Sequence, residues 1–305
     1  MKKIILLVII SVVSCCAEKE HLCLNLKKGE TYTQKIYFTS LTIQTINGNE
    51  NKTNLSYGMN LSFKVLSIQG NVYELEVRYV NMWTKMIAQN RLFEFSSEKH
   101  DKNDIFSTIL NALTEKSFIV LMTRTGKVNQ VKNLENMWIH LFERMPNLGE
   151  VERAQLKTQL SQSYGEKAFK GNIQMVTAIF PDSLVSIGDK WSVATQLEGG
   201  MAANIKAIYE LKKVAGSNCI INGVAKIETA NKDAYIKSSN GMPMKLNLKG
   251  TVTSEIKIDR KTGWVLDSRV NQSMSGDVRV KDNPQLPGGL IIPMTMDSET
   301  IASEK

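Results

Sequence analysis

The sequence has little of the residue types that build disulfide frameworks and metal sites. Its 305 residues include four cysteines and three histidines. Two cysteines are adjacent and two are isolated, which is not the spacing of a disulfide-stapled domain. The one close His–Cys pair, His21 and Cys23, has no further metal-ligating residues at a suitable spacing. We therefore expect no metal site and no cofactor.

The sequence also lacks the short motifs of common catalytic sites, such as Gly-x-Ser-x-Gly, a phosphate-binding glycine loop or His-Glu-x-x-His. Glu74 and Glu76 are paired carboxylates of the kind that glycoside hydrolases use. They share a strand face with Arg78, which favours a solvated surface. The formal charge is +8, and its basic residues are scattered. We expect no enzyme activity and no nucleic-acid partner, with an envelope hydrolase as a minor alternative.

Long hydrophobic runs are absent except at the amino terminus. Ile4 to Val13 is apolar apart from one serine and follows two lysines. The run has the length of a signal-peptide core and is shorter than the ~20 residues that span a bilayer. The next residues, up to Cys15, resemble a bacterial lipobox. We predict a signal peptide at 1–14 and lipidation of Cys15, since two or more acyl chains anchor a protein stably. A plain cleaved signal and an uncleaved anchor are the alternatives.

The residues after Cys15 are polar and are expected to form a tether, at 15–27. Glu18 and Glu20 resemble the acidic export signals of some surface lipoproteins, but Lys19 interrupts them. The predicted location is the bacterial cell envelope, anchored by lipid to the outer membrane. The sequence leaves open whether the protein faces the periplasm or the cell surface.

Most of the chain alternates between apolar and polar residues, as antiparallel strands do. Every second residue from Leu55 to Val65 is apolar, and Gln69-Gly70-Asn71 is a turn signal. A similar alternation runs from Met244 to Ile258. The final strand, Ile291 to Thr300, contains a proline and is expected at a sheet edge. The predicted class is mostly β (α+β), with antiparallel sheets that are curved or half-barrel-like.

The middle of the chain has helical periodicity. We predict helices near 104–115, at 134–145 with Asn133 as N-cap, at 150–164 and at 166–178. The second helix carries an apolar stripe, which is core in most proteins and in some lines a ligand cavity. This candidate cavity wall consists of Met137, Trp138, Leu141, Phe142 and Met145.

The two β regions share a weak repeat. Leu26–Tyr32 and Val185–Trp191 both read apolar, two residues, glycine, acid, any residue, aromatic, and Thr-Gly hairpins at 125–126 and 262–263 follow in the same order. We interpret this as two related β modules, although any two meander sheets share turns. The predicted divisions after the tether are a first β module with a short helix at 28–132, a helical connector at 133–180 and a second β module at 181–305.

Three features of the chain resemble a family of bacterial envelope lipoproteins known as domain of unknown function 6263. They are Val13-Ser14-Cys15, the Phe180-Pro181 pair followed by Gly188-Asp189-Lys190-Trp191, and the Thr262-Gly263-Trp264 hairpin. The resemblance extends over nearly all of the chain after Cys15. It implies a lipid-anchored, β-rich protein and carries over no catalytic residue.

Two functions fit these patterns. The first is non-enzymatic binding of a hydrophobic small molecule, since a curved one-sided sheet leaves an apolar cleft and the 14 methionines suit an adaptable surface. The alternative is a structural or accessory lipoprotein that docks on an envelope protein complex. In either case the membrane is a partner through the amino-terminal lipid. Asp182-Ser183-Leu184 also resembles a short O-glycosylation motif, which makes Ser183 a candidate for modification.

Overall fold

The computed structural model describes residues 18–101, 104–145, 148–198, 202–237, 241–284 and 286–304, so the predicted signal peptide and Cys15 lie outside it. The helices are α1 (Ile105–Glu115), α2 (Glu135–Glu143), α3 (Glu150–Tyr164) and α4 (Glu166–Thr177). The strands are β1 (Thr31–Ile46), β2 (Asn49–Gln69), β3 (Val72–Ala88), β4 (Arg91–Ser96), β5 (Ser117–Thr123), β6 (Val128–Lys132), β7 (Lys190–Leu197), β8 (Ala203–Ala215), β9 (Asn218–Thr229), β10 (Ile236–Lys237), β11 (Pro243–Asp259), β12 (Val265–Val280) and β13 (Leu290–Ser303).

The strands form one 13-stranded sheet. Its path is β6-β5-β3-β2-β1-β13-β12-β11-β9-β8-β7, and β4 and β10 add to β3 and β11. The predicted mostly β, antiparallel class is confirmed. The two β regions lie in a single continuous sheet, because β1 pairs with β13 from Lys35↔Ser303 to Gln44↔Met294. The predicted separation into two sheet modules is therefore not seen. That the two halves are related to each other stays a prediction.

The position of β13 differs from the expected one. The strand lies between β1 and β12, at the centre of the sheet and not at an edge. Pro293 pairs with Asp277 of β12, but it lies one residue beyond Gln44↔Met294, the last pair with β1. The missing N–H of Pro293 therefore removes no hydrogen bond to β1, which is how a central strand accommodates this proline.

Three helices follow the predicted ranges, and the helix predicted at 134–145 is shorter at both ends, Glu135–Glu143. Asp104 caps α1 by accepting a hydrogen bond from the Ser107 N–H at 3.0 Å, and α3 and α4 lie where the periodicity places them. The predicted N-cap of α2 is wrong: Asn133 has a left-handed φ of 65° and α2 starts only at Glu135. Within the described ranges, none of the helices has the length and apolar character needed to cross a membrane.

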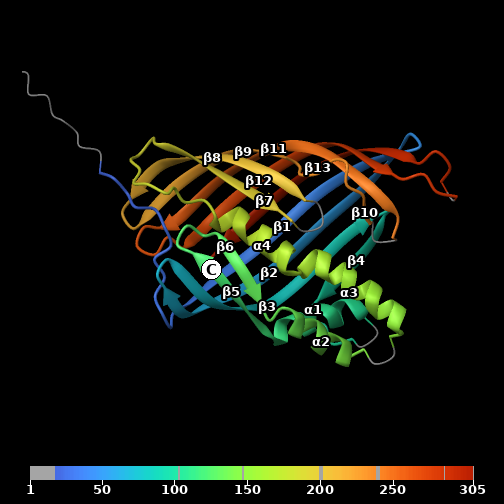
Figure 1. Ribbon diagram of the computed structural model, residues 1–305, viewed down its shortest axis with the longest axis horizontal. Coiled ribbons are helices and arrows are strands. Elements are labelled where there is room, and N and C mark those ends of the chain that lie inside the picture. Colours follow the sequence, from blue (N-terminus) through green and yellow to red (C-terminus); the bar gives the residue numbers. More distant parts are fainter. Residues whose placement is uncertain are drawn as a thin grey trace, which may run out of the picture.

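Helix α4 crosses the open side of the curved sheet and lies between its two edge strands, β6 and β7 (Figure 1). The Gln174 side chain accepts a hydrogen bond from the Val128 N–H at 2.9 Å, and Glu166 accepts one from the Val131 N–H at 3.3 Å. On the opposite side, Gly171 of α4 packs closely against Leu197 of β7. The helix thus satisfies backbone groups of an otherwise free sheet edge.

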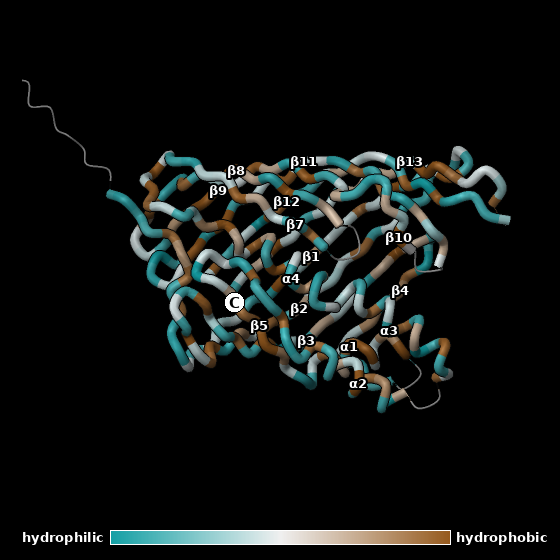
Figure 2. Tube along the Cα trace, viewed as in Figure 1, coloured by the Kyte–Doolittle hydropathy of each residue, from teal (hydrophilic) through white to brown (hydrophobic). Residues whose placement is uncertain are grey.

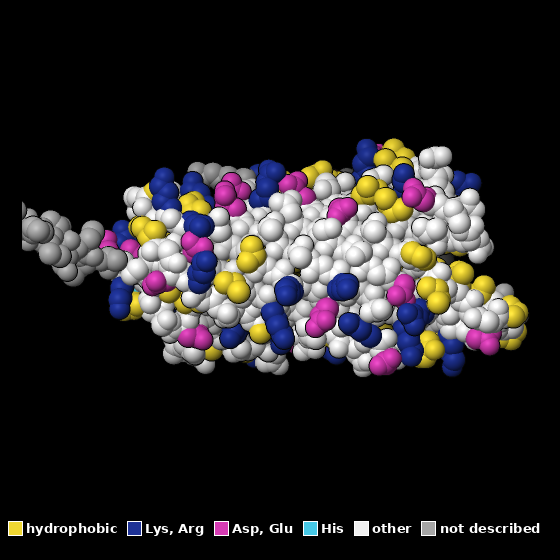
Figure 3. Space-filling view, turned by 90° about the horizontal axis from the view of Figure 1, so that it is seen from above, with side chains coloured by type: hydrophobic (Ala, Val, Ile, Leu, Met, Phe, Trp, Pro, Cys, Tyr) yellow, Lys and Arg dark blue, Asp and Glu magenta, His cyan; other side chains and the backbone are white. Residues whose placement is uncertain are grey.

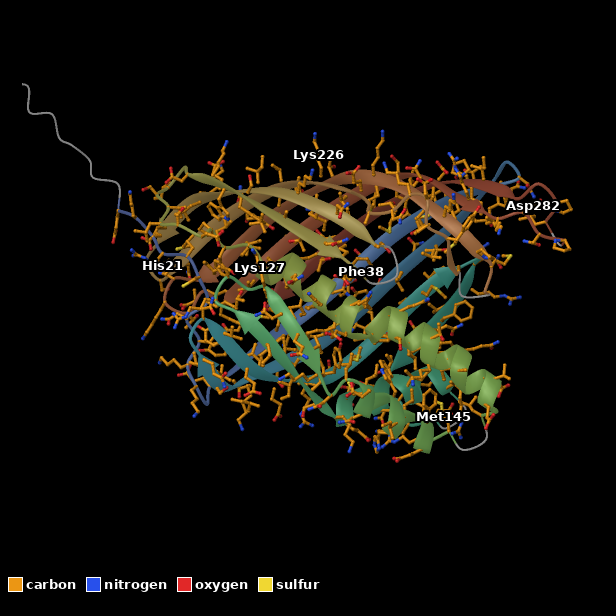
Figure 4. The ribbon with its side chains drawn as sticks, in the orientation of Figure 1. His21, Phe38, Lys127, Met145, Lys226 and Asp282 are labelled. Atoms are coloured by element: carbon orange, nitrogen blue, oxygen red, sulfur yellow. The ribbon has the colours of Figure 1, made fainter. Side chains whose placement is uncertain are left out.

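The amino-terminal segment covers one end of the curved sheet. Residues 18–26, the N-terminal strap, bury Leu22, Leu24 and Leu26, each at most 3 % exposed. The Leu24 N–H donates to the Arg124 carbonyl and the Asn25 N–H to the Thr262 carbonyl, both at 2.7 Å. The strap therefore joins hairpins from both halves of the sheet. Figure 4 shows His21 of the strap and Asp282 at opposite ends of the molecule.

Candidate functional site

The two faces of the sheet have different partners. We call the face toward α4 the inner face and the opposite one the outer face. Successive side chains of each strand point to opposite faces. Leu61, Phe63 and Val65 of β2 point inward and are at most 2 % exposed. The alternation of hydropathy along the strands is visible in Figure 2.

The inner face of the six central strands carries no charge. Along β11, β12, β13, β1, β2 and β3, every described residue that points inward is apolar or is an uncharged polar residue. Lysines and acids on the same strands point outward. A ligand on this face would meet only apolar surface, hydroxyls and amides.

The middle of the inner face is only half buried. One hydrophobic core lies toward the strap and α1–α4, and a second lies under β8, β9, β11 and β12. Between them runs a set of inward-pointing, half-buried residues that we call the central strip. It comprises Ile36, Phe38, Ser40 and Thr42 of β1, Leu55, Tyr57 and Met59 of β2, Met86 of β3, Gln272 of β12, and Met294, Met296, Ser298 and Thr300 of β13. Figure 4 shows Phe38 near the middle of the molecule.

Methionines are concentrated on the inner face. Among the described residues, eight of the 14 methionines point inward from the sheet. Met175 of α4, Met294 and Met296 pack against the second core. Because methionine is flexible and polarisable, such a surface adapts to apolar guests of different shape. The inward methionines of the sheet are Met59, Met82, Met86, Met122, Met244, Met274, Met294 and Met296.

An aromatic pair and three tyrosine hydroxyls lie on the side of β1, β2 and β3. The rings of Phe38 and Tyr57 stack with centroids 4.7 Å apart. Burial, with a smaller effect of the nearby Tyr164 hydroxyl on α3, raises the pKa of Tyr57 to about 12. Burial also raises the pKa of Tyr79 and of Tyr164. These hydroxyls make no hydrogen bond with another described residue. Tyr79 is closed off in the core, but Tyr57 is half buried on the central strip, so its hydroxyl can donate to a guest molecule.

Two further polar groups are buried without partners at the strap end of the strip. Gln34 of β1 is 6 % exposed and Ser268 of β12 is 2 % exposed. The Gln34 Nε2 and the Ser268 Oγ are buried and have no hydrogen-bond partner among the described residues. An unsatisfied buried polar group costs about 1–3 kcal/mol. A small cavity of about 30 Å³ lies between α4 and the inner face, lined in part by Gln174, Met175 and Val270.

The outer face has the opposite character. Its middle is covered mainly by uncharged polar side chains, and charged residues of both signs lie toward the margins (Figure 3). Two shallow grooves of about 530 Å³ each cross it, lined by residues such as Thr39, Asn54 and Asn271. Tyr37 and Trp83 form an exposed aromatic pair there, at 5.8 Å between centroids. This surface is polar and open, as solvated sheet faces are.

The structure places the predicted cavity-wall residues in and around the core between α1 and α2. Met137 and Leu141 are 0 % exposed and Trp138 is 6 % exposed. Phe142 and Met145 are half buried against this core. Trp138 and Phe142 also line a surface hollow of about 290 Å³ between α2 and α3. Their role in ligand binding stays a prediction.

The structure also describes the candidate glycosylation site Ser183 and the carboxylate pair Glu74 and Glu76. Ser183 is exposed, as glycosylation would require, and its modification stays a prediction. Within the described ranges no cluster of histidine, cysteine and acidic residues has metal-binding geometry. Glu76 pairs with Arg78, and Glu74 accepts a hydrogen bond from Ser67, in line with a structural surface role.

Sequence reasoning did not identify the central strip. The signal was present in the spacing of Met294, Met296, Ser298 and Thr300, which alternate on one face. Pro293 predicts an edge position for this strand, whereas the structure places it in the centre of the sheet. The pairing of β13 with β1 joins residues that are more than 200 positions apart, and short-range patterns carry no information on such pairing.

The glycine–tryptophan motifs hold the strap and β7 in place. A Cβ on Gly263 would lie 2.1 Å from the Cys23 carbonyl oxygen, and its φ is +68°. Trp264 donates from Nε1 to the Thr33 carbonyl at 3.1 Å and packs against Tyr32 and Phe63. Trp191 donates to the Ile179 carbonyl at 2.8 Å. These residues have structural roles next to the inner face.

Together these features define a single-sheet antiparallel β protein with an uncharged, half-buried inner face that a helix crosses. The chain belongs to DUF6263, a family of unknown function, whose model matches residues 70–265. No curated protein matches its sequence.

Solved structures show only distant likeness. A lipovitellin structure matches 92 % of this chain at 9 % identity with a TM-score of 0.49, and the match covers 25 % of the lipovitellin chain. An outer membrane channel from Pseudomonas putida F1 matches 91 % of this chain and 97 % of its own, at 10 % identity with a TM-score of 0.24.

Proposed function

We propose that this protein binds a hydrophobic small molecule against the central strip, without catalysing a reaction. The observation that carries the proposal is the half-buried state of inward-pointing Phe38, Tyr57 and Met296, which lie between two closed cores. Apolar side chains at the centre of a fold are normally covered, and covering them releases about 25 cal/mol per Å². An apolar guest would gain this free energy.

The proposal extends to the location of the protein. A lipid on Cys15 would hold the chain at a membrane of the bacterial envelope, where hydrophobic molecules are abundant. Only Cys16 and Ala17 separate Cys15 from the first residues of the strap. Because an extended residue spans at most ~3.6 Å, the strap end would lie close to the membrane surface.

The proposal is tested with the full chain and a neutral hydrophobic dye, N-phenyl-1-naphthylamine. We expect saturable binding with a stoichiometry near one. The Ser40→Trp variant fills the strip and should weaken binding by about tenfold or more. Thr39→Trp is the matched control, since Thr39 is the next residue on β1 and points to the outer face. Absence of saturable binding, or an equal effect of both variants, would contradict the proposal.

Docking on an envelope protein complex is the second candidate, and β4 favours it. Among the described residues β4 pairs only with β3. On its other edge the Ser96 N–H donates to Ser107 of α1 at 3.1 Å, and no described strand covers the edge around Leu92. Leu92 and Phe93 on this strand are 54 % and 37 % exposed. A free, apolar edge can accept a strand from a partner. Crosslinking from position 92 in membranes would identify such a partner, and loss of the crosslink in Leu92→Pro would assign it to the edge.

A further inference from the structure

The chemistry of the central strip restricts the kind of molecule that it can hold. The inner face of the six central strands has no charged side chain, so a charged head group on this face would find no counter-ion there. Transfer of an ionised carboxylate or phosphate from water to such a surface is strongly unfavourable. Apolar chains carry no such penalty and match Phe38 and the methionines.

Uncharged polar groups are nevertheless present, and they are adjacent to one another. Ser40, Ser298 and Gln272 lie side by side on β1, β13 and β12, as the registers Ser40↔Ser298 and Gln272↔Ser298 show. The two serine hydroxyls make no hydrogen bond to another described residue, whereas the Gln272 Nε2 donates to the Met274 sulfur at 3.2 Å. Gln34 Nε2 and Ser268 Oγ add two buried, unpartnered groups at the strap end of the same face. A site with free neutral donors and acceptors favours a guest that has a hydroxyl, ester or amide.

We propose that the ligand is an uncharged amphiphile whose ester, alcohol or amide group meets the row Ser40–Ser298–Gln272 while its apolar chain lies against Phe38, Tyr57 and the inward methionines. This inference rests on the proposed function and names the ligand class of that same site. The raised pKa of Tyr57 is in keeping with it, because a phenol that stays protonated donates a hydrogen bond but does not neutralise an anion.

The inference is tested by displacement of N-phenyl-1-naphthylamine from the full chain at about pH 9, where a fatty acid is ionised. The probes are methyl oleate and oleate, which share one chain and differ in the charge of the head group. We expect methyl oleate to bind at least about tenfold more tightly. Equal binding, or a preference for oleate, would overturn the inference while the dye still reports a working site. A chain that binds neither the dye nor either probe would overturn the proposed function itself.

A pair of variants tests the position of the head group. Ser298→Lys places a cation within the row and should reverse the preference, so that oleate binds more tightly than methyl oleate. Ser273→Lys is the control, because Ser273 lies on the outer face of β12 next to Gln272. An unchanged preference in Ser298→Lys, with its fold confirmed by circular dichroism, would place the head group elsewhere. If the preference were reversed in both variants, the added positive charge alone would explain it, whatever its position. This result would also contradict the inference.

Discussion

The strap end and the central strip of the inner face are built from the same strands, but only the strap end is closed. On β1, Tyr32 and Gln34 are buried, while Phe38 and Ser40 are half buried, although all four point inward. At the strap end, Leu24 and Trp264 cover the sheet. The N-terminal strap does not extend over the central strip, which lies between the two hydrophobic cores. Burial on this sheet therefore depends on what packs against it and not on the alternation of the strand.

The largest expected difference between the two regions is in how much one aromatic side chain contributes to the free energy of unfolding. Trp264→Ala should lower the free energy of unfolding by about 3–5 kcal/mol, because it empties a packed site beneath the strap. Phe38→Ala should cost only about 1–2 kcal/mol, since part of its ring is already exposed. Chemical denaturation of both variants measures the contrast. Equal losses of the free energy of unfolding in the two variants would contradict the distinction between a closed strap end and an accessible central strip.

The strap itself can be released by one methyl group. Gly263→Ala places a Cβ against the Cys23 carbonyl and should cost about 2–4 kcal/mol. Gly188→Ala is the matched control, because Gly188 also has a positive φ, +92°, but has nothing within 4 Å. It should cost about 1 kcal/mol. Limited proteolysis should cleave the strap only in Gly263→Ala, and equal protection in both variants would contradict this role of the strap.

One tyrosine at the strap end and one in the central strip differ in their hydrogen bonds. The Tyr73 hydroxyl donates to the Leu24 carbonyl at 2.9 Å and accepts from the Leu26 N–H at 3.2 Å. Tyr73→Phe leaves these buried strap groups without partners and should cost about 1–3 kcal/mol. Tyr57→Phe removes a hydroxyl that has no partner among the described residues, and it should change stability by less than about 0.5 kcal/mol. A larger loss for Tyr57→Phe in denaturation would show that the strip is structurally closed.

The smallest expected effect is a difference in alkaline stability. The pKa of Tyr57 is raised to about 12 in the fold, above the ordinary value of 10.0. Since the folded pKa is the higher one, its contribution to stability is complete below pH 10.0 and is lost as the pH rises toward 12. Tyr57→Phe should therefore lose less stability than the natural chain over this interval. Denaturation midpoints between pH 9 and 11 that fall in parallel would contradict the buried environment of this phenol.

Local patterns predicted much of the fold because they reflect local physics. The alternation from Leu55 to Val65 and the periodicities that gave α1, α3 and α4 follow from how side chains distribute on strands and helices. The pairing of β1 with β13 was not foreseen, because Pro293 suggested an edge and no short-range signal opposed it. The central strip could not be predicted either, since half-buried Phe38 and fully buried Tyr32 occupy equivalent positions in one alternating strand. Only the three-dimensional packing distinguishes them.

We predict that the central strip, and not the outer face, holds the hydrophobic ligand. The most direct test of this prediction is photolabelling of the full chain with a diazirine-bearing neutral oleyl ester, followed by residue-level mapping of the label. We expect label on Phe38, Tyr57 and Met296, and loss of this label in the Ser40→Trp variant. Label on Tyr37 and Trp83 of the outer face, or in the hollow between α2 and α3, would contradict it.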